Sequence, residues 1–210
     1  MKKLFAVLIF TISVVYAQDD WSSAKQLSID GVHPYNMIGI PAITVDSNGV
    51  IHAFWVKSIE EDGGALPWEW YSQIEYRRSA DGGKTWTAIE NLTPDYFEHR
   101  INYMKAVCDS KNNVHLVYMR GSEGYEILYK KFDGLSWSAP ELIGYGSSFL
   151  RMNIDNEDRI YATWMIGREA YFAYCYNGVW SDYMQIGSGE YGISNIKFDE
   201  DNILYSSGTC

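Results

Sequence analysis

Short runs of aliphatic and aromatic residues alternate along this chain with turns rich in glycine, asparagine and aspartate. Such runs are typical of β-strands, because β-branched and aromatic side chains suit a pleated surface while Gly, Asn and Asp suit tight turns. Beyond residue 17 we find no stretch with apolar residues at helical spacing. The pattern therefore predicts an all-β protein.

The strand-like runs repeat, and each repeat can be aligned on an aspartate. The four copies are DSNGVIHAFW, DSKNNVHLVY, DNEDRIYATW and DEDNILYSSG, which begin at Asp46, Asp109, Asp155 and Asp199. A second pattern interleaves with the first and opens on a tryptophan, at Trp21, Trp86, Trp137 and Trp180. Each unit predicts four strands: one runs into the aspartate, one follows the turn, a third precedes the tryptophan and a fourth starts at it.

A unit of four strands that recurs about every 45 residues is typical of a blade in a β-propeller. The chain contains three full units and one half unit, so we expect about three and a half four-stranded antiparallel blades. Because propellers usually have at least about four blades, we expect a truncated or incomplete propeller. The alternative is a four-bladed ring in which the strand at Trp21 pairs with the fourth unit.

The N-terminus has the layout of a secretory signal peptide. Lys2 and Lys3 precede the apolar run Leu4–Val15, and Ala17 ends a plausible cleavage site. We therefore interpret residues 1–17 as a signal peptide and residues 18–210 as the repeat domain; a short anchor that stays attached is the alternative. The run is too short for a typical membrane span. We expect an exported protein, periplasmic, on the cell surface or extracellular, with no membrane insertion after cleavage.

Composition excludes some classes of partner and cofactor. The formal net charge is −10, and an acidic chain repels phosphate backbones, so we expect no nucleic-acid partner. The three cysteines are too few for a disulfide framework. His52 and His115 occupy the same repeat position on successive blades, which diverge, and the acidic turns lack the spacing of calcium loops. We expect neither a cofactor nor a metal.

The stretch SADGGKTW lies between a third and a fourth strand. It matches the Asp-box pattern S-x-D-x-G-x-T-W at Ser79, Asp81, Gly83, Thr85 and Trp86. On these residues, and over roughly residues 21–208, the chain resembles the sialidase-like propeller family with Asp-box (BNR) repeats. Later units keep degenerate copies, FDGLSW and YNGVW, at the same place. Because turns recur from blade to blade and catalytic groups usually do not, we expect Asp81 to have a structural role.

The resemblance raises the question of sialidase activity. Sialidases of this fold carry an arginine in an R-I-P motif on the first inner strand, where it binds the substrate carboxylate. Here the matching stretch is IGIPAI, and Gly39 stands at the arginine position. Asp62 is the nearest match to the acid/base aspartate, but it lies in a generally acidic loop. Since a retaining glycosidase needs two matched groups, the sequence favours a protein without catalysis.

Two groups of residues are candidates for ligand binding. Trp68, Trp70 and Tyr71 lie in the long insertion of unit one, where they could stack on a sugar ring; packing that seals the loop is the alternative. Arg100 and Arg151 are close to inner strands and are expected to face the central channel, although Arg151 could instead pair with a local acid.

We therefore expect a secreted or cell-surface sialidase-like propeller that binds a glycan or an extracellular protein. One alternative is an exo-sialidase or related glycoside hydrolase whose remaining catalytic residues lie in missing blades. Another is a purely structural module of a larger exported protein.

Overall fold

A computed structural model describes residues 25–28, 38–59, 71–94, 100–121, 125–188, 193–198 and 204–208. All regular elements of these residues are β-strands, which confirms the all-β prediction. The described part of the chain contains no helix long and apolar enough to cross a membrane. The predicted signal peptide, Asp62, Trp68 and Trp70 lie outside the described residues.

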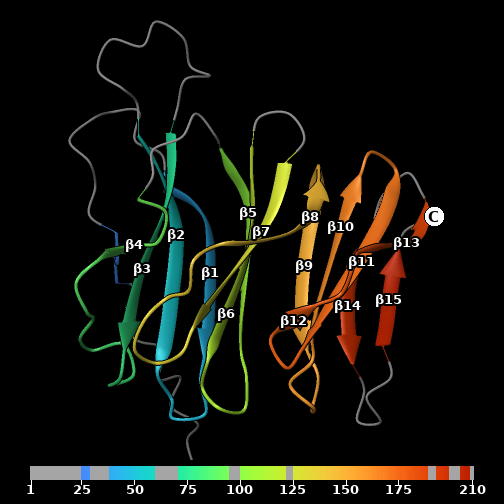
Figure 1. The fold of residues 1–210 in the computed structure, drawn as a ribbon. Coiled ribbons are helices and arrows are strands. Elements are labelled where there is room, and N and C mark those ends of the chain that lie inside the picture. The colour runs from blue at the N-terminus through green and yellow to red at the C-terminus, as the bar shows by residue number, and fades with distance from the viewer. Residues whose placement is uncertain are drawn as a thin grey trace, which may run out of the picture.

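The strands form antiparallel sheets in chain order (Figure 1). Sheet 1 contains β1 (Ile38–Val45), β2 (Ile51–Ile59), β3 (Tyr71–Ser79) and β4 (Glu90–Asn91). Sheet 2 contains β5 (Ile101–Cys108), β6 (Val114–Arg120), β7 (Tyr125–Phe132) and β8 (Glu141–Gly146). Sheet 3 contains β9 (Ser148–Ile154), β10 (Ile160–Ile166), β11 (Glu169–Tyr176), β12 (Val179–Trp180) and β13 (Met184–Ser188). The two-stranded sheet 4 contains β14 (Ile193–Phe198) and β15 (Leu204–Gly208).

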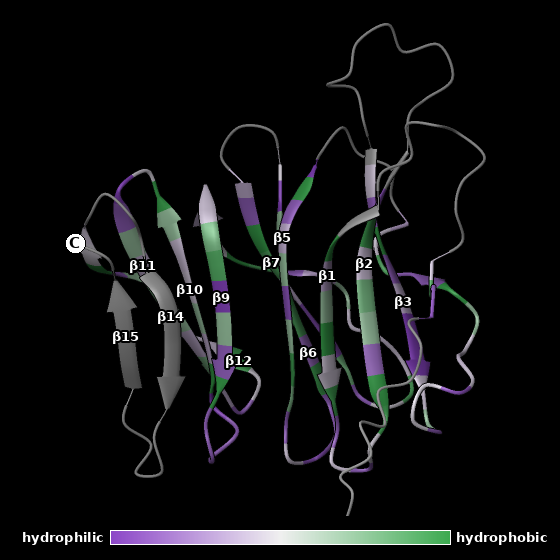
Figure 2. Cartoon of the chain, turned by 180° about the vertical axis from the view of Figure 1, so that it is seen from behind, coloured by the Kyte–Doolittle hydropathy of each residue, from purple (hydrophilic) through white to green (hydrophobic). Residues whose placement is uncertain are grey.

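The first strands of the four sheets, β1, β5, β9 and β14, are neighbours in that order (Figures 1 and 2). Successive sheets pack face to face around two apolar clusters. One cluster, with Phe54, Met104 and Leu116, lies between sheets 1 and 2. The other lies between sheets 2 and 3 and includes Ile127 and Trp164. The core is therefore divided between the interfaces of the sheets.

The turn between the first and second strands has the same construction in sheets 1, 2 and 3. The third residue after each aspartate has a left-handed backbone: Gly49 (φ 78°), Asn112 (φ 65°) and Asp158 (φ 60°). Glycine, asparagine and aspartate tolerate this conformation best. Neighbouring turns are also joined, because the hydroxyl group of Ser47 donates to Asn112 Oδ1 (2.6 Å) and that of Ser110 to Asp158 Oδ2 (2.6 Å).

The fourth strands differ from the prediction that they start at the tryptophan. In sheet 2, Trp137 makes only an isolated bridge, and β8 begins four residues later at Glu141. The residue after the tryptophan explains the gap. Ser138 N donates to Lys131 O (2.8 Å), and Lys131 N donates to Ser138 Oγ (3.0 Å) instead of to a backbone carbonyl. The Ser138 hydroxyl group thus replaces the backbone carbonyl that would accept from Lys131 N in a regular antiparallel ladder.

The same substitution occurs in the neighbouring sheets. Thr87 N donates to Arg78 O while Arg78 N donates to Thr87 Oγ1, and Ser181 and Tyr174 repeat the arrangement. Every W-S or W-T pair in the described residues therefore marks a short side-chain-assisted contact. In sheet 1 regular pairing resumes only at β4.

Candidate functional site

The segment Ser79–Trp86 closes the turn between β3 and β4 on itself. Asp81 accepts hydrogen bonds from Ser79 Oγ (2.8 Å), Thr85 N (2.9 Å) and Thr85 Oγ1 (2.6 Å). The bonds from Thr85 and Ser79 lower the pKa of Asp81 to about 2. Gly82 and Gly83 take positive φ angles, and the Trp86 indole donates to Gly83 O (3.0 Å). Every donor to Asp81 comes from its own turn, so the geometry supplies a brace rather than a reactive acid.

We expect Asp81→Ala to loosen this turn, because the amide and hydroxyl groups of Thr85 lose their acceptor. Hydrogen exchange at the Thr85 amide should speed up, while exchange in the core strand β6 stays unchanged. Asp81→Asn is the matched control, since it keeps one carbonyl oxygen and should have a smaller effect. Unchanged protection of Thr85 in Asp81→Ala would contradict the bracing role.

The aspartate of the first turn of sheet 2, between β5 and β6, is linked to a buried His–Tyr pair. In sheet 2, His115 Nε2 contacts Asp109 Oδ2 (3.2 Å), and His115 Nδ1 contacts Tyr129 Oη (2.7 Å). Burial lowers the pKa of His115, so the ring is neutral near pH 7. Because a carboxylate only accepts, Nε2 carries the proton and Tyr129 donates to Nδ1. His52 and Tyr76 repeat the second contact at 2.8 Å in sheet 1.

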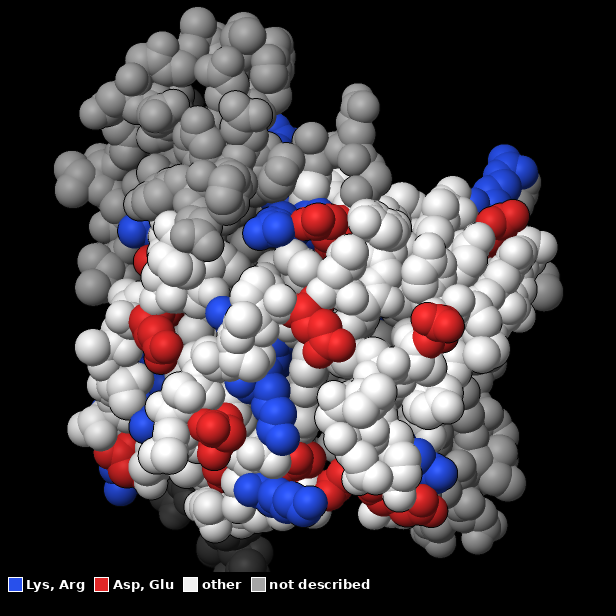
Figure 3. Space-filling model, in the orientation of Figure 1, with Lys and Arg blue, Asp and Glu red and all other residues white. Residues whose placement is uncertain are grey.

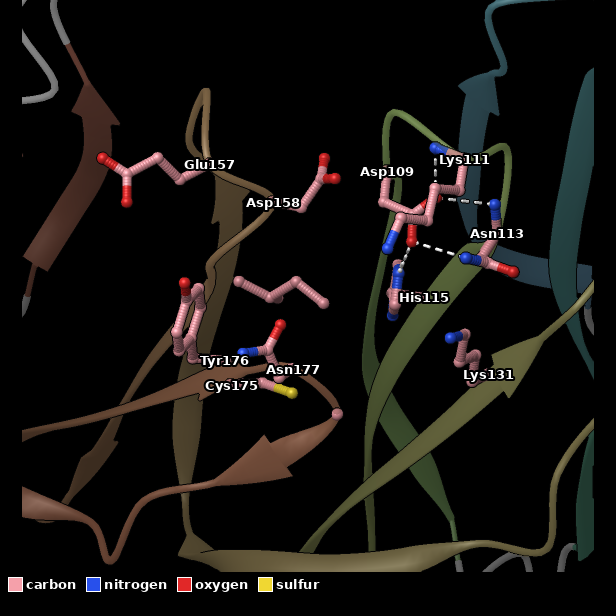
Figure 4. Close-up of a pocket in the computed structure, with 12 residues that line it drawn as sticks. Asp109, Lys111, Asn113, His115, Lys131, Glu157, Asp158, Cys175, Tyr176 and Asn177 are labelled. Atoms are coloured by element: carbon pink, nitrogen blue, oxygen red, sulfur yellow. Dashed lines mark hydrogen bonds and ion pairs between the residues drawn. The ribbon is translucent and has the colours of Figure 1, made fainter.

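A cavity of about 290 Å³ opens between sheets 2 and 3 beside these turns (Figure 4). Its lining groups from sheet 2 face those from sheet 3 across the space. Sheet 2 and its turn contribute Asp109, Lys111, Asn113, His115 and Lys131; sheet 3 and its turns contribute Glu157, Asp158, Ile160, Cys175, Tyr176, Asn177 and Gly178. The lining is mainly polar, and the repeat pattern did not predict a site here.

Of the predicted site residues, Gly39, Arg100 and Arg151 lie on or directly before first strands, whereas Tyr71 is on β3. Gly39 is in β1 opposite Val56, beside a bulge in which Ile40 has a φ of 50°. Arg100 precedes β5 and is exposed, and its carbonyl accepts Gly121 N (3.1 Å). Tyr71 begins β3.

Arg151 lies within β9 and is half-buried, and its Nη1 donates to Leu150 O (3.0 Å). Burial and the nearby Arg151 charge lower the pKa of Lys105 on β5. Lys105 was not among the predicted residues. The repeat carries the signal, because Lys105 stands four residues before Asp109 and Arg151 four before Asp155. The structure therefore brings two cations together on adjacent first strands.

The described residues contain no group of three or more His, Cys, Asp or Glu side chains that could hold a metal ion. On the face drawn in Figure 3, acidic and basic side chains are interspersed rather than gathered by sign.

No protein-family model matches the chain. No curated protein matches it. Solved structures, in contrast, do match the chain. A protein of unknown function from Dyadobacter fermentans has a TM-score of 0.52 at 16% identity, covering 82% of this chain and 57% of its own. A point mutant of NanB sialidase from Streptococcus pneumoniae has a TM-score of 0.50 at 11% identity, covering 72% of this chain and 40% of its own.

The Hadza microbial sialidase Hz136 has a TM-score of 0.49 at 16% identity, covering 70% of this chain and 33% of its own. The chain thus spans less than two thirds of each of these structures. The fold is sialidase-like, and at these identities the likeness concerns the fold alone.

Proposed function

We propose that the chain is part of an exported, sialidase-like β-propeller that binds a glycan or an extracellular protein without hydrolysing it. The observation that carries the proposal is the stack of sheets with neighbouring first strands, combined with a glycine at position 39. In this proposal each sheet is a blade, and the first strands are the inner strands. The predicted signal peptide supports export.

The side-by-side first strands support the propeller interpretation. The strands that head four successive sheets lie next to one another, as they do when sheets fan out from a common line. The turns at Asp46, Asp109 and Asp155 lie at the same end of the stack, as the repeat requires (Figure 1). The likeness to NanB, at a TM-score of 0.50, agrees with this arrangement.

Gly39 is the argument against hydrolysis of sialosides. A sialidase holds the substrate carboxylate with an arginine at the matching position, and glycine supplies no positive charge. Arg151 and Lys105 do supply positive charge on the first strands, but from β9 and β5. An acidic sugar can therefore be attracted without the arrangement that sialidases use. Trp68, Trp70 and Tyr71 are proposed as the surface on which a glycan stacks.

We expect the purified protein to release no sialic acid from a fluorogenic sialoside, and to bind sialylated glycans on an array. Lys105→Gln together with Arg151→Gln should weaken binding to sialylated glycans at least tenfold, because the charge contacts are lost. Trp68→Ala with Trp70→Ala should weaken binding to neutral glycans as well.

Three outcomes decide between the functions. Release of sialic acid would favour the hydrolase. Failure of the folded protein to retain any glycan would favour protein binding or a structural module. Array binding that survives both double variants would overturn the assigned residues.

A further inference from the structure

Phe132 fills the space between sheets 1 and 2 at the edge near their first turns. Its ring lies 6.3 Å from the His52 ring, centroid to centroid, and 5.2 Å from the guanidinium carbon of Arg78. The ring is 4% exposed. At this interface an aromatic side chain of one sheet covers the His and Arg of the sheet before it.

The equivalent position in sheet 3 is occupied by Cys175. Phe132 pairs with the strand residue five places after Asp109, and Cys175 pairs with the residue five places after Asp155. On the facing sheet, His115 and Lys131 pair as His52 and Arg78 do. A thiol where the previous interface has a phenyl ring leaves the space open, and this is the cavity in Figure 4.

Lys131 brings a positive charge to the cavity. Its ammonium group acts to lower the pKa of the His115 ring and of the Cys175 thiol. Burial has the larger effect on both groups, and it lowers the pKa of His115 but raises that of Cys175. Burial raises the pKa of Cys175 to about 11, so the thiol stays protonated and unreactive near pH 7. Among the residues drawn in Figure 4, neither the Lys131 ammonium group nor the Asn177 amide has a hydrogen-bond partner.

The acidic groups of the cavity are already held in place. Asp109 accepts from His115, from the Asn113 side chain (2.6 Å) and from two backbone amides. Asp158 accepts from the amide and hydroxyl groups of Ser110. The negative charges of these two carboxylates are balanced by the positive charges of Lys111 and Lys131, which also line the cavity.

Opposite charges in equal number leave little net attraction for an ion, and Glu157 is paired with Arg159 at 3.3 Å. The remaining groups are donors and acceptors without net charge. The Asn177 amide offers both, Asn113 Oδ1 accepts, and the half-exposed Tyr176 is a further lining residue. A hydroxyl group both donates and accepts, so a ligand with several hydroxyl groups matches such a lining.

We propose that this cavity binds a single neutral sugar ring. Its volume of about 290 Å³ lies just below the usual range for ligand pockets, about 300–1,000 Å³, which suits one ring rather than a chain. The site lies at the end of the sheets with the first turns, opposite the ends of β2 and β3 that flank residues 60–70 (Figure 1). It therefore lies at the opposite end of the sheets from Tyr71, which begins β3 (Figure 1).

The test is a titration of the ¹⁵N-labelled protein with glucose, galactose, mannose and N-acetylglucosamine, followed by NMR. We expect at least one sugar to give saturable shifts, in the millimolar range, of the Asn113 and Asn177 side-chain amides and the Gly178 amide. Glucuronate should bind no more tightly than glucose, because Asp109 and Asp158 offset the positive charges of Lys111 and Lys131. No saturable shift with any of the four sugars, or tighter binding of glucuronate, would overturn the proposal.

Variants locate the binding. Cys175→Phe restores the ring found between sheets 1 and 2 and should abolish the shifts; Leu135→Phe adds the same ring at a side chain 91% exposed and should not change them. Asn177→Gly preserves the positive φ of the turn (52°) while it removes the amide, and should weaken binding at least threefold. Sugar shifts that persist in both Cys175→Phe and Asn177→Gly would overturn the site. Loss of binding in Trp68→Ala with Trp70→Ala alone would assign it to the other surface.

Discussion

Replacing Trp164 by alanine is expected to lower the free energy of unfolding by about 3–5 kcal/mol, the usual range for a buried tryptophan. Trp164 is 1% exposed and extends from β10 of sheet 3 onto β8 of sheet 2. Its indole donates to Tyr145 O (2.6 Å). Removing the ring would leave both a cavity between two sheets and a partly buried carbonyl without its donor. Urea unfolding followed by circular dichroism measures the loss.

The two glycines beneath this ring give a complementary test. A Cβ atom at Gly144 would lie 2.5 Å from Trp164 Cζ2, and one at Gly146 would lie 2.8 Å from Trp164 Cδ1. Gly144→Ala should therefore cost about 1–3 kcal/mol through overpacking. Leu135→Ala is the control, since that side chain is 91% exposed and the change should stay within about 0.5 kcal/mol. Equal stabilities of Trp164→Ala and Leu135→Ala would contradict the packing account.

Asp155→Ala is expected to lower the free energy of unfolding by about 2–3 kcal/mol, because it leaves several partly buried donors without an acceptor. The Asp155 side chain has no exposed surface. It accepts from Glu157 N (2.8 Å), from Arg159 N and Nε, and from Tyr161 Oη (2.9 Å). This one carboxylate joins both ends of the turn between β9 and β10 to Tyr161, beside the backbone bonds of the turn. Urea unfolding at pH 7 measures its contribution.

The pH dependence of the free energy of unfolding distinguishes the contribution of the Asp155 charge from that of its packing. Burial acts to raise the pKa of Asp155, but the hydrogen bonds from Arg159, Glu157 and Tyr161 outweigh it and hold the pKa below its usual value. A carboxylate whose pKa is lower in the folded state than in the unfolded state stabilises the folded state. The full stabilisation is present at pH values above the unfolded pKa, about 3.9, and it is lost as the pH falls through the folded pKa. The difference between wild type and Asp155→Ala should therefore narrow below about pH 4.

Asp155→Asn is the matched variant for this experiment, because it keeps the size and one carbonyl acceptor but has no carboxylate to titrate. It should fall between wild type and Asp155→Ala at pH 7. A stability difference between wild type and Asp155→Ala that stays constant from pH 7 to pH 3 would show that the charge contributes nothing.

The candidate cavity could have been predicted in part from the sequence. Aligning the third strands of the units sets Cys175 against Phe132 and Lys131 against Arg78, so a smaller side chain at one interface could have been noticed. The alignment alone does not say which side chains of one sheet meet those of the next. The same holds for Lys105 and Arg151, whose repeat positions match but whose closeness depends on the packing of β5 against β9.

The sequence by itself determined the all-β class, the order of the strands and the position of the turns at Asp46, Asp109 and Asp155, because strand periodicity and turn chemistry act over a few neighbouring residues. It did not determine that the fourth strands of sheets 1 and 2 begin after their tryptophans. Only the tertiary structure decided how the sheets meet: Trp164 above two glycines, Ser110 bonded to Asp158, and an open space beside Cys175. These contacts join residues from different repeats. Whether the side chains at such an interface fill the space or leave a cavity is decided only when the sheets pack against each other.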